Sequence, residues 1–396
     1  MNLTEQKKDE LFTSDYLFTF ASNFLMFFAF YMLLPILPMY LADQFGAGKS
    51  LIGAILASYT ITALIVRPFA GFLVDRFQRK PLFLLAYTLF IGYFAGYIVA
   101  GTIMVFAVLR ATHGLAFGLV TISSSTVAVD IMPASRRNEG IGYFGLSMNI
   151  AMAIGPMTAL YLFDTTGNYD YIFGGALLSG IIGLCCIFFI HTPYKERIQH
   201  EAISFDRFFL VKGLPGAINL ALLSFSYGIL STYVAVYGSE EVGLESGTGL
   251  FFVAMAGGLV ISRVISGRMM NRGELNKVIN TGIIIMFLSY IVFIFLKTAA
   301  GFFLSALFLG FAYGFVCPAF QAMFINLAHH NQRGTANSTY FIAWDLGIGT
   351  GVLLGGQIAE ISSYTSAYIC GLILVASGYL LFRYVTAKHY IKNKLY

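Results

Sequence analysis

The most regular feature of the chain is the alternation of long apolar segments with short polar ones. Twelve segments are long and apolar enough to cross a bilayer as helices, which takes about 20 residues each. They cover residues 16–41, 50–73, 81–100, 103–131, 139–163, 170–191, 212–237, 246–269, 276–296, 299–328, 335–359 and 366–386. The ten-residue alternating strands of a membrane β-barrel do not occur in the sequence. The pattern predicts an all-α polytopic membrane protein with twelve transmembrane helices.

Composition excludes an ordinary soluble enzyme. Of the 396 residues 58% are hydrophobic and only 11% are charged, whereas about a quarter of the residues in soluble domains are charged. The 24 Lys and Arg residues stand at the ends of apolar segments rather than in one basic stripe, so no nucleic-acid partner is expected. Residues 1–15 have no cleavable signal pattern, and the first helix is expected to act as its own insertion signal.

The basic residues also predict the orientation. With the N-terminus inside, nineteen of them fall on the cytoplasmic side and only Lys49 and Lys297 face outward. The other three, Arg67, Arg110 and Arg263, lie within apolar segments. Cytoplasmic loops of membrane proteins are enriched in Lys and Arg. We therefore expect a multi-pass protein of the cell (inner or plasma) membrane with both termini in the cytoplasm.

The chain contains an internal repeat. Its longest interior polar stretch, residues 191–213, lies near the midpoint, and a shift of 196 residues superposes several arginines and glycines of the two halves. The pairs are Arg67 with Arg263, Gly71 with Gly267, Arg76 with Arg272, Gly114 with Gly310, Gly118 with Gly314, Arg137 with Arg333 and Gly155 with Gly351. Repeats with an even number of helices share one orientation in the membrane. The predicted organisation is a cytoplasmic segment 1–15, six-helix bundles 16–191 and 212–386 with a cytoplasmic linker 192–211 between them, and a cytoplasmic tail 387–396.

The loop after the second apolar segment resembles a known signature. GFLVDRFQRK (71–80) is similar to Gly-x-Leu-x-Asp-Arg-x-Gly-Arg-Lys of the major facilitator superfamily, with Gln78 in place of a glycine. A degraded copy, GRMMNRGELNK (267–277), follows the eighth segment. The resemblance implies the twelve-helix major facilitator fold. It also implies a conformational gate formed by Gly71, Asp75, Arg76 and Arg79, with Arg272 in the second copy.

Three further motifs resemble the drug:proton antiporter branch of this superfamily. LPILP (34–38) is similar to a proline motif of the first helix, and Arg110 with Gly114 and Gly118 is similar to an Arg-x-x-x-Gly motif of the fourth. AMAIGPMTAL (151–160) keeps Gly155 and Pro156 of the antiporter motif of helix 5, but it has alanine at two of its glycine positions.

The gate residues can be interpreted without the resemblance. Asp75 lies where the second helix meets the cytoplasm, so its carboxylate can accept hydrogen bonds from arginine and face the positive N-terminal end of a helix that starts at the same level. Such contacts break when two bundles move apart, and they then act as a latch. The alternative is a solvated, positively charged loop without a moving part.

Four residues inside the apolar segments are candidates for a central site. An arginine as deep as Arg110 is costly without a cavity or partner, and His113, one turn away, titrates near neutral pH when unperturbed; the alternative for His113 is a buried packing residue. Asp345 is the only carboxylate near mid-bilayer, and the repeat pairs it with Asn149. Asp345 is expected to carry protons or bind a cationic substrate group, or else to serve as a fixed counter-ion for Arg110.

Other polar and aromatic residues complete the expected picture. Tyr31, Tyr227 and Gln321 could line the central site together with Asn23, Asn219 and Trp344. Asp130 and Glu139, which flank PASRR, are expected to pair with Arg136, Arg137 or Arg67.

The predicted function is alternating-access transport with proton-coupled efflux of a small amphipathic or cationic molecule. The alternative on the same fold is an importer or facilitator of a polar metabolite. A membrane-embedded enzyme or receptor is disfavoured because the sequence has no HExxH, no phosphate-binding glycine loop with lysine, and no long outer loop. No metal site or cofactor is expected, the proton gradient being the energy source. The expected partners are a small-molecule substrate, protons and lipid, and the protein is expected to be a monomer.

Overall fold

The computed structural model describes residues 10–193, 207–244 and 248–395. These residues form helices joined by short turns, and no strand occurs among them. Twelve helical spans in this part of the chain are long and apolar enough to cross a membrane. This confirms the all-α fold class and the number of transmembrane helices. The predicted segment 1–15 and the predicted linker 192–211 lie mostly outside the described residues.

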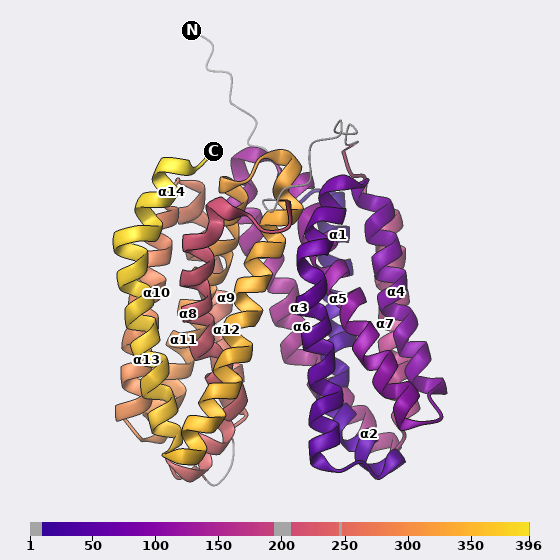
Figure 1. The fold of residues 1–396 in the computed structure, drawn as a ribbon. Helices are drawn as coiled ribbons and strands as arrows, with labels where there is room; N and C mark the ends of the chain where they lie inside the picture. The colour runs from indigo at the N-terminus through magenta and orange to yellow at the C-terminus, as the bar shows by residue number, and fades with distance from the viewer. Residues whose placement is uncertain (1–9, 194–206, 245–247, 396) are drawn as a thin grey trace.

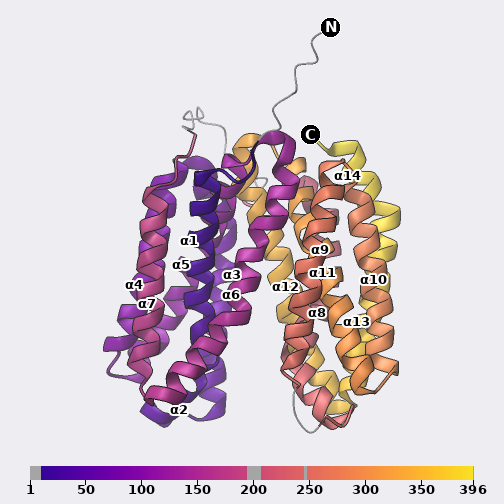
Figure 2. The same cartoon turned by 180° about the vertical axis from the view of Figure 1, so that it is seen from behind.

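The helices form two bundles that stand side by side (Figure 1). The first bundle contains α1 (Ser14–Leu33), α2 (Ile36–Phe45), α3 (Lys49–Arg76), α4 (Arg79–Val99), α5 (Ile103–Ile131), α6 (Arg137–Thr166) and α7 (Tyr169–Phe188). The second contains α8 (Leu214–Glu240), α9 (Leu250–Asn271), α10 (Leu275–Phe295), α11 (Ala299–Leu327), α12 (Arg333–Ile361), α13 (Tyr364–Leu381) and α14 (Ala387–Asn393), with a π-helical turn, Phe382–Thr386, before α14. Helix α1 begins and α14 ends on one side of the molecule, here called the terminal face, and Figure 2 shows the same arrangement from behind.

The first predicted segment, 16–41, is divided in the structure. Helix α1 ends at Leu33 and α2 begins at Ile36, with Pro35 at the junction. Proline has no backbone N–H and its ring clashes with the preceding turn, which interrupts a helix. Helix α2 then ends at Gly46, which adopts a left-handed φ of 61° and donates its N–H to Ala42 O. The proline motif therefore separates a long helix from a short one far from the terminal face.

Glycines bring neighbouring helices into close contact at equivalent places in the two bundles. A Cβ atom on Gly114 of α5 would lie 2.2 Å from the carbonyl oxygen of Tyr59 on α3. A Cβ atom on Gly310 of α11 would lie 1.8 Å from the carbonyl oxygen of Met255 on α9. Each residue of the second contact is 196 positions after its counterpart in the first. Small residues allow such close backbone approach in membrane helices, and the repeat read from the sequence recurs here in three dimensions.

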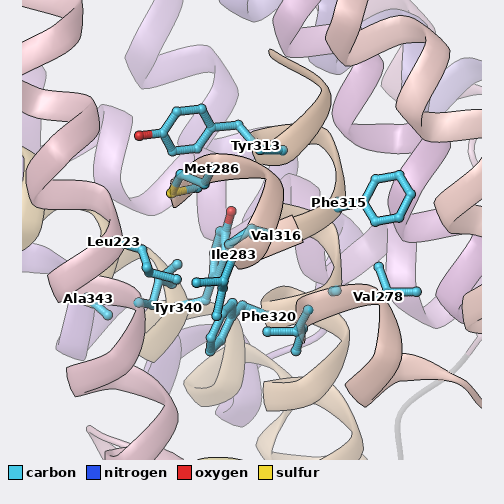
Figure 3. Packing of buried hydrophobic residues seen from close by; sticks show 14 of the residues in the cluster. Leu223, Val278, Ile283, Met286, Tyr313, Phe315, Val316, Phe320, Tyr340 and Ala343 are labelled. Atoms are coloured by element: carbon cyan, nitrogen blue, oxygen red, sulfur yellow. The ribbon is translucent and has the colours of Figure 1, made fainter. Parts of the chain in front are cut away.

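The interior of each bundle is apolar, and so is much of the outer surface. In the second bundle, Ile283 and Met286 of α10 are fully buried in an apolar cluster that also contains side chains of α8, α11 and α12 (Figure 3). Large apolar residues such as Ile61, Ile65 and Phe69 of α3 are each more than half exposed. An outer surface of this kind suits lipid rather than water, which agrees with the membrane-spanning lengths of the helices.

Candidate transport site between the bundles

The two largest contacts between the bundles lie toward the terminal face (Figure 1). We call the contact of α3 with α12 the α3–α12 seam; it is formed mainly by Arg67, Gly71, Asp75, Gly334, Thr335, Ser338 and Asp345. We call the contact of α6 with α9 the α6–α9 seam; it is formed mainly by Glu139, Gly145, Arg263, Gly267 and Asn271. The 196-residue repeat relates α3 of the first seam to α9 of the second, and α12 of the first seam to α6 of the second.

Asp75 caps a helix of the opposite bundle. Its Oδ1 accepts a hydrogen bond from Gly334 N at 2.8 Å, and its Oδ2 accepts from Thr335 N at 2.8 Å and from Thr335 Oγ1 at 2.9 Å. These donors lie in the first turn of α12, where the helix dipole favours an anion. Arg79 Nη1 lies 3.2 Å from Asp75 Oδ1 on the side of the first bundle. The carboxylate, 7% exposed, therefore joins the bundles through contacts that must break if they separate here.

The other predicted gate residues differ in their contacts. Gly71 lets α3 approach α12, since a Cβ atom there would lie 2.7 Å from the Cβ of Ser338. Arg76 is exposed, with its guanidinium carbon 5.7 Å from the centre of the Phe72 ring. Arg272, its counterpart in the repeat, is exposed as well. The structure thus gives Gly71 and Asp75 contacts across the seam, whereas Arg76 and Arg272 lie at the surface.

Asp130, at the end of α5, has partners other than those expected. Its Oδ2 lies 2.8 Å from Arg79 Nε, and its Oδ1 lies 2.7 Å from Arg333 Nη1. Arg79 and Arg333 each begin a helix at the level where α5 ends, which brings both guanidinium groups to this carboxylate. The partners expected from the sequence, Arg67, Arg136 and Arg137, are wrong for Asp130. Because Arg333 belongs to the second bundle, this pair also crosses between the bundles.

The α6–α9 seam repeats the capping arrangement with an amide. Asn271, 196 residues after Asp75, accepts a hydrogen bond on Oδ1 from Glu139 N at 3.3 Å, and its Nδ2 donates to the Glu139 carboxylate. Arg136 Nε lies 2.9 Å from Glu139 Oε2, so here an expected partner is found. A Cβ atom on Gly267 would lie 3.3 Å from Glu139 Cγ. The first turn of α6 is therefore capped by a neutral side chain.

Asp345 forms an ion pair across the α3–α12 seam. Its Oδ2 lies 2.6 Å from Arg67 Nη2, and the two side chains are 18% and 4% exposed. The Arg67 guanidinium carbon also lies 4.7 Å from the centre of the Phe341 ring, and Ser338 Oγ donates to Arg67 O at 2.6 Å. The alternative that Asp345 is the counter-ion of Arg110 is wrong, since the structure pairs it with Arg67. An arginine inside a membrane span was the signal that could have placed Arg67 in the site.

Arg110 and His113 lie inside the first bundle. The guanidinium carbon of Arg110 is 4.0 Å from the centre of the Tyr59 ring, and His113 Nδ1 is 2.7 Å from Tyr97 Oη. Both residues are almost fully buried, and the rings around His113 come from α3 and α4. Among the described residues, no hydrogen bond or ion pair connects either side chain with Asp345. Their role in a central cavity stays a prediction.

The aromatic residues expected at the central site pack against neighbouring side chains. The ring of Tyr227 on α8 has its centre 5.3 Å from that of Trp344, and its Oη lies 4.0 Å from Met152 Sδ on α6. In the first bundle, Tyr31 packs where α1 meets α6. A Cβ atom on Gly155 would lie 2.9 Å from Tyr31 Cβ, and Pro156 follows within the continuous helix α6.

Amide groups extend the polar contacts between the bundles. Gln321 Nε2 donates to Asn337 Oδ1 at 2.9 Å, and Asn337 Nδ2 donates to Thr126 Oγ1 at 3.2 Å across the bundles. Asn149, in contrast, donates to Gly145 O within its own helix at 3.0 Å. The polar residues Asn23 and Asn219 also bond within their own bundles. No cluster of His, Cys, Asp or Glu in the described ranges is arranged to hold a metal ion.

Two bundles of membrane-spanning helices that stand side by side, joined by polar contacts between them, are an architecture found in membrane transporters. The sequence model of the Major Facilitator Superfamily matches residues 19–352 and 276–394. The chain belongs to the Major Facilitator Superfamily. Proteins of this family are transporters, so the chain is a transport protein of the membrane rather than an enzyme, with a small molecule as substrate.

Similar proteins are found by sequence and by structure. The chain is 24% identical over 366 residues to the "Quinolone resistance protein NorA" of Staphylococcus aureus (strain MRSA252), covering 87% of this chain and 90% of that protein. It is 25% identical over 368 residues to the "Staphylopine export protein" of S. aureus (strain Mu50 / ATCC 700699), covering 89% and 91%.

Solved structures show the same fold. The human organic anion transporter MFSD10 (TETRAN) matches with a TM-score of 0.78 at 17% identity, covering 93% of this chain and 99% of that one. A bacterial homologue of the iron transporter ferroportin in an outward-facing state matches with a TM-score of 0.79 at 16% identity, covering 94% and 99%.

Proposed function

We propose that the protein is a proton-coupled exporter of a small amphipathic or cationic molecule, in which Asp345 carries the proton. The observation that supports this proposal best is the Asp345–Arg67 pair, a partly accessible carboxylate held by a buried guanidinium of the other bundle. The names of the relatives, one a resistance protein and one an export protein, favour outward transport. The antiporter-like motifs of α5 and α6 favour the same direction.

Protonation of Asp345 would weaken the α3–α12 seam. A neutral carboxyl group no longer neutralises Arg67, and removing one partner from a buried ion pair typically costs about 3–5 kcal/mol. The free energy that holds the seam closed would fall by an amount of this order. Proton loading from the outside would therefore favour separation of the bundles at the terminal face, and release of the proton would favour closure again.

Asp75 would act as a second latch on the same seam. Its three hydrogen bonds to the first turn of α12 must be lost when α3 and α12 separate. An anion at a helix N-terminus contributes about 0.3–2 kcal/mol, less than the Arg67–Asp345 pair. Asp75 would therefore set how easily the seam opens, whereas Asp345 would connect the opening to the proton.

The terminal face would be the cytoplasmic side of the cell membrane, because the Lys and Arg excess lies there. The seams are closed at that face, so the conformation described is the one expected after export of the substrate. We further propose that the two bundles span residues 16–191 and 212–386, that the linker 192–211 and both ends of the chain are cytoplasmic, and that the protein works as a monomer. An importer or facilitator of a polar metabolite is the alternative on the same fold, and the alanines in the motif of α6 favour it.

A sealed-vesicle assay tests the proposal. Inverted membrane vesicles would carry a preset pH gradient, and lipophilic cations and polar metabolites would be added in turn. We expect a compound-dependent loss of the gradient that disappears in Asp345→Asn. Glu274→Gln, which removes a partly exposed carboxylate at the terminal face paired with Lys277, is the matched control and should behave as wild type. Equilibration of labelled metabolites without proton movement would contradict proton-coupled export and support the alternative.

A further inference from the structure

Arg263 is a buried cation that has no anionic partner in the part of the chain that the structure describes. It is 4% exposed, and its Nε and Nη1 atoms are buried with no hydrogen-bond partner among the described residues. No carboxylate of the described ranges lies within ion-pair distance of it. Its ionisable neighbours Tyr16, Cys317 and Tyr340 are groups that are uncharged at neutral pH.

The equivalent arginine of the other seam shows what Arg263 lacks. Arg67 stacks on Phe341 and pairs with Asp345. At the positions 196 residues earlier, α6 has Gly145 and Asn149. Arg263 Nη2 lies 3.2 Å from the point where a Cβ of Gly145 would be. Arg263 therefore approaches α6 at the level where Arg67 approaches α12, but α6 supplies neither a ring nor a carboxylate there.

An unpaired guanidinium in such a place is costly, because a buried charge needs a counter-charge and hydrogen bonds. The cost disappears if the counter-charge comes from a bound molecule. A guanidinium donates two parallel hydrogen bonds to a planar carboxylate. The Asn149 amide, one turn from Gly145, donates one N–H to Gly145 O and has a second N–H to offer a ligand. Since Arg263 supplies a single positive charge, it suits a monoanion better than a doubly charged phosphate.

We propose that Arg263 and Asn149 form a subsite for a carboxylate group of the transported molecule. The subsite becomes accessible when the α6–α9 seam opens at the terminal face, and it is closed in the conformation described. The substrate is then an amphipathic molecule that bears a carboxylate in addition to any cationic group. This inference rests on the proposed export function and narrows its substrate class.

Two dyes that differ only in one ester group test the subsite. Rhodamine 110 is a zwitterion with a free carboxylate, and rhodamine 123 is its methyl ester, a simple cation. Their binding to the purified full-length protein in lipid nanodiscs would be measured by fluorescence anisotropy. We expect wild type to bind rhodamine 110 about tenfold more tightly than rhodamine 123, as one charge-assisted contact predicts.

Two substitutions at one position separate charge from shape. Asn149→Asp gives Arg263 an internal counter-ion, as Asp345 does for Arg67, and it should abolish the preference for rhodamine 110. Asn149→Ala, which leaves the guanidinium free, should retain most of it. Arg263→Gln should also abolish the preference, and Asn149→Asp keeps the test decisive if Arg263→Gln does not fold. Equal binding of the two dyes by wild type, no saturable binding of rhodamine 110, or an unchanged preference in Asn149→Asp would overturn the proposal.

The outcome can be distinguished from failure of the export proposal. Proton-driven transport of rhodamine 123 that depends on Asp345, combined with no preference for the free acid, would remove the carboxylate subsite and leave export intact. A tenfold preference for rhodamine 110 without any proton-driven transport would support the carboxylate subsite and contradict proton-coupled export.

Discussion

The α3–α12 and α6–α9 seams have the same backbone plan but different charges. In the first, two carboxylates cross between the bundles: Asp75 caps α12, and Asp345 pairs with Arg67. In the second, the equivalent positions hold Asn271 and Asn149. Helix capping survives the change because an amide oxygen also accepts hydrogen bonds, but the ion pair does not. The comparison indicates that the repeated framework carries carboxylates at these two positions in one seam only, while Glu139 supplies the carboxylate of the other seam from a different position.

This difference suggests separate tasks for the two seams. A seam with a carboxylate near mid-membrane can respond to protons, because protonation changes the charge of the contact. A seam with a free guanidinium can respond to an anionic ligand, because the ligand completes an unfinished pair. In that view the α3–α12 seam binds and releases the proton, and the α6–α9 seam binds the substrate. The two would be coupled because both open when the bundles separate at the terminal face.

The largest effect is expected from Asp345→Asn, which gives the first seam the amide that the second seam has at the equivalent position, Asn149. Gradient-driven transport should fall about a hundredfold, as for loss of an essential proton carrier, while the protein still inserts and folds. The measurement is uphill transport in sealed vesicles beside the yield and elution profile of the purified protein. Uphill transport at the wild-type rate would remove Asp345 from the coupling role.

A smaller effect is expected from Asp75→Asn, which gives the first seam the neutral cap of the second. The amide oxygen can still accept from one side of the α12 N-terminus, but the amide nitrogen cannot accept from the remaining donors and the charge is lost, so we expect the open form to gain up to about tenfold in population. The readout is labelling of a cysteine placed at Ser338, which is buried in the seam, in a chain whose four native cysteines are replaced. Asn271→Ala is the comparison in the other seam, where loss of a neutral cap should change this labelling less. Identical labelling of wild type and Asp75→Asn would argue against the latch.

A modest gain in stability is expected from Asn149→Asp, which gives the second seam the ion pair of the first. Arg263 is buried whether or not it has a partner, so an added carboxylate restores a counter-charge that is otherwise missing. The melting temperature in detergent should rise by about 3 °C or more. A lower melting temperature would show that the α6 backbone does not allow the pair.

The smallest effect is expected from a charged contact that lies within the second bundle and belongs to neither seam. Glu241, at the end of α8 and outside the membrane-spanning segments, accepts hydrogen bonds from Thr365 N and from Lys297 Nζ at 3.0 and 2.9 Å. Burial disfavours its charged form, but these hydrogen bonds and the Lys297 charge outweigh burial and lower the pKa of Glu241. A lowered folded-state pKa contributes stability above the unfolded-state value of about 4.3, and this stability is lost as the pH falls through the folded-state pKa.

Glu241→Gln should therefore reduce the melting temperature by no more than about 3 °C at pH 7, and the difference should shrink in acid below about pH 4. Transport should be unchanged, because Glu241, Thr365 and Lys297 all belong to the second bundle. A transport defect as large as that of Asp75→Asn would show that the seams are not the special contacts of this molecule.

The sequence by itself determined the twelve transmembrane helices and the repeat that relates the two bundles. Both depend on local or periodic properties: apolar runs of membrane length, and arginines and glycines that recur at a fixed offset. The position of Asp75 at the end of a helix also indicated a contact with another helix N-terminus, since helix ends expose unpaired N–H groups. Pro35 could be seen in the sequence, but the apolar segment 16–41 looks the same whether the proline breaks the helix or only bends it. The sequence therefore did not predict that α1 and α2 are separate helices.

Only the tertiary structure decided which charges meet. Asp345 pairs with Arg67, 278 positions away, and Asp130 takes Arg333 of the other bundle, because those side chains project from facing helices at the same depth. His113 faces the aromatic residues of α4 for the same reason. Hydropathy places a residue at a depth in the membrane, but it does not tell which face of its helix touches which neighbour. Which faces touch depends on how the whole bundles pack. The lack of a counter-ion for Arg263 among the described residues is therefore recognised only when the two seams are compared in the structure.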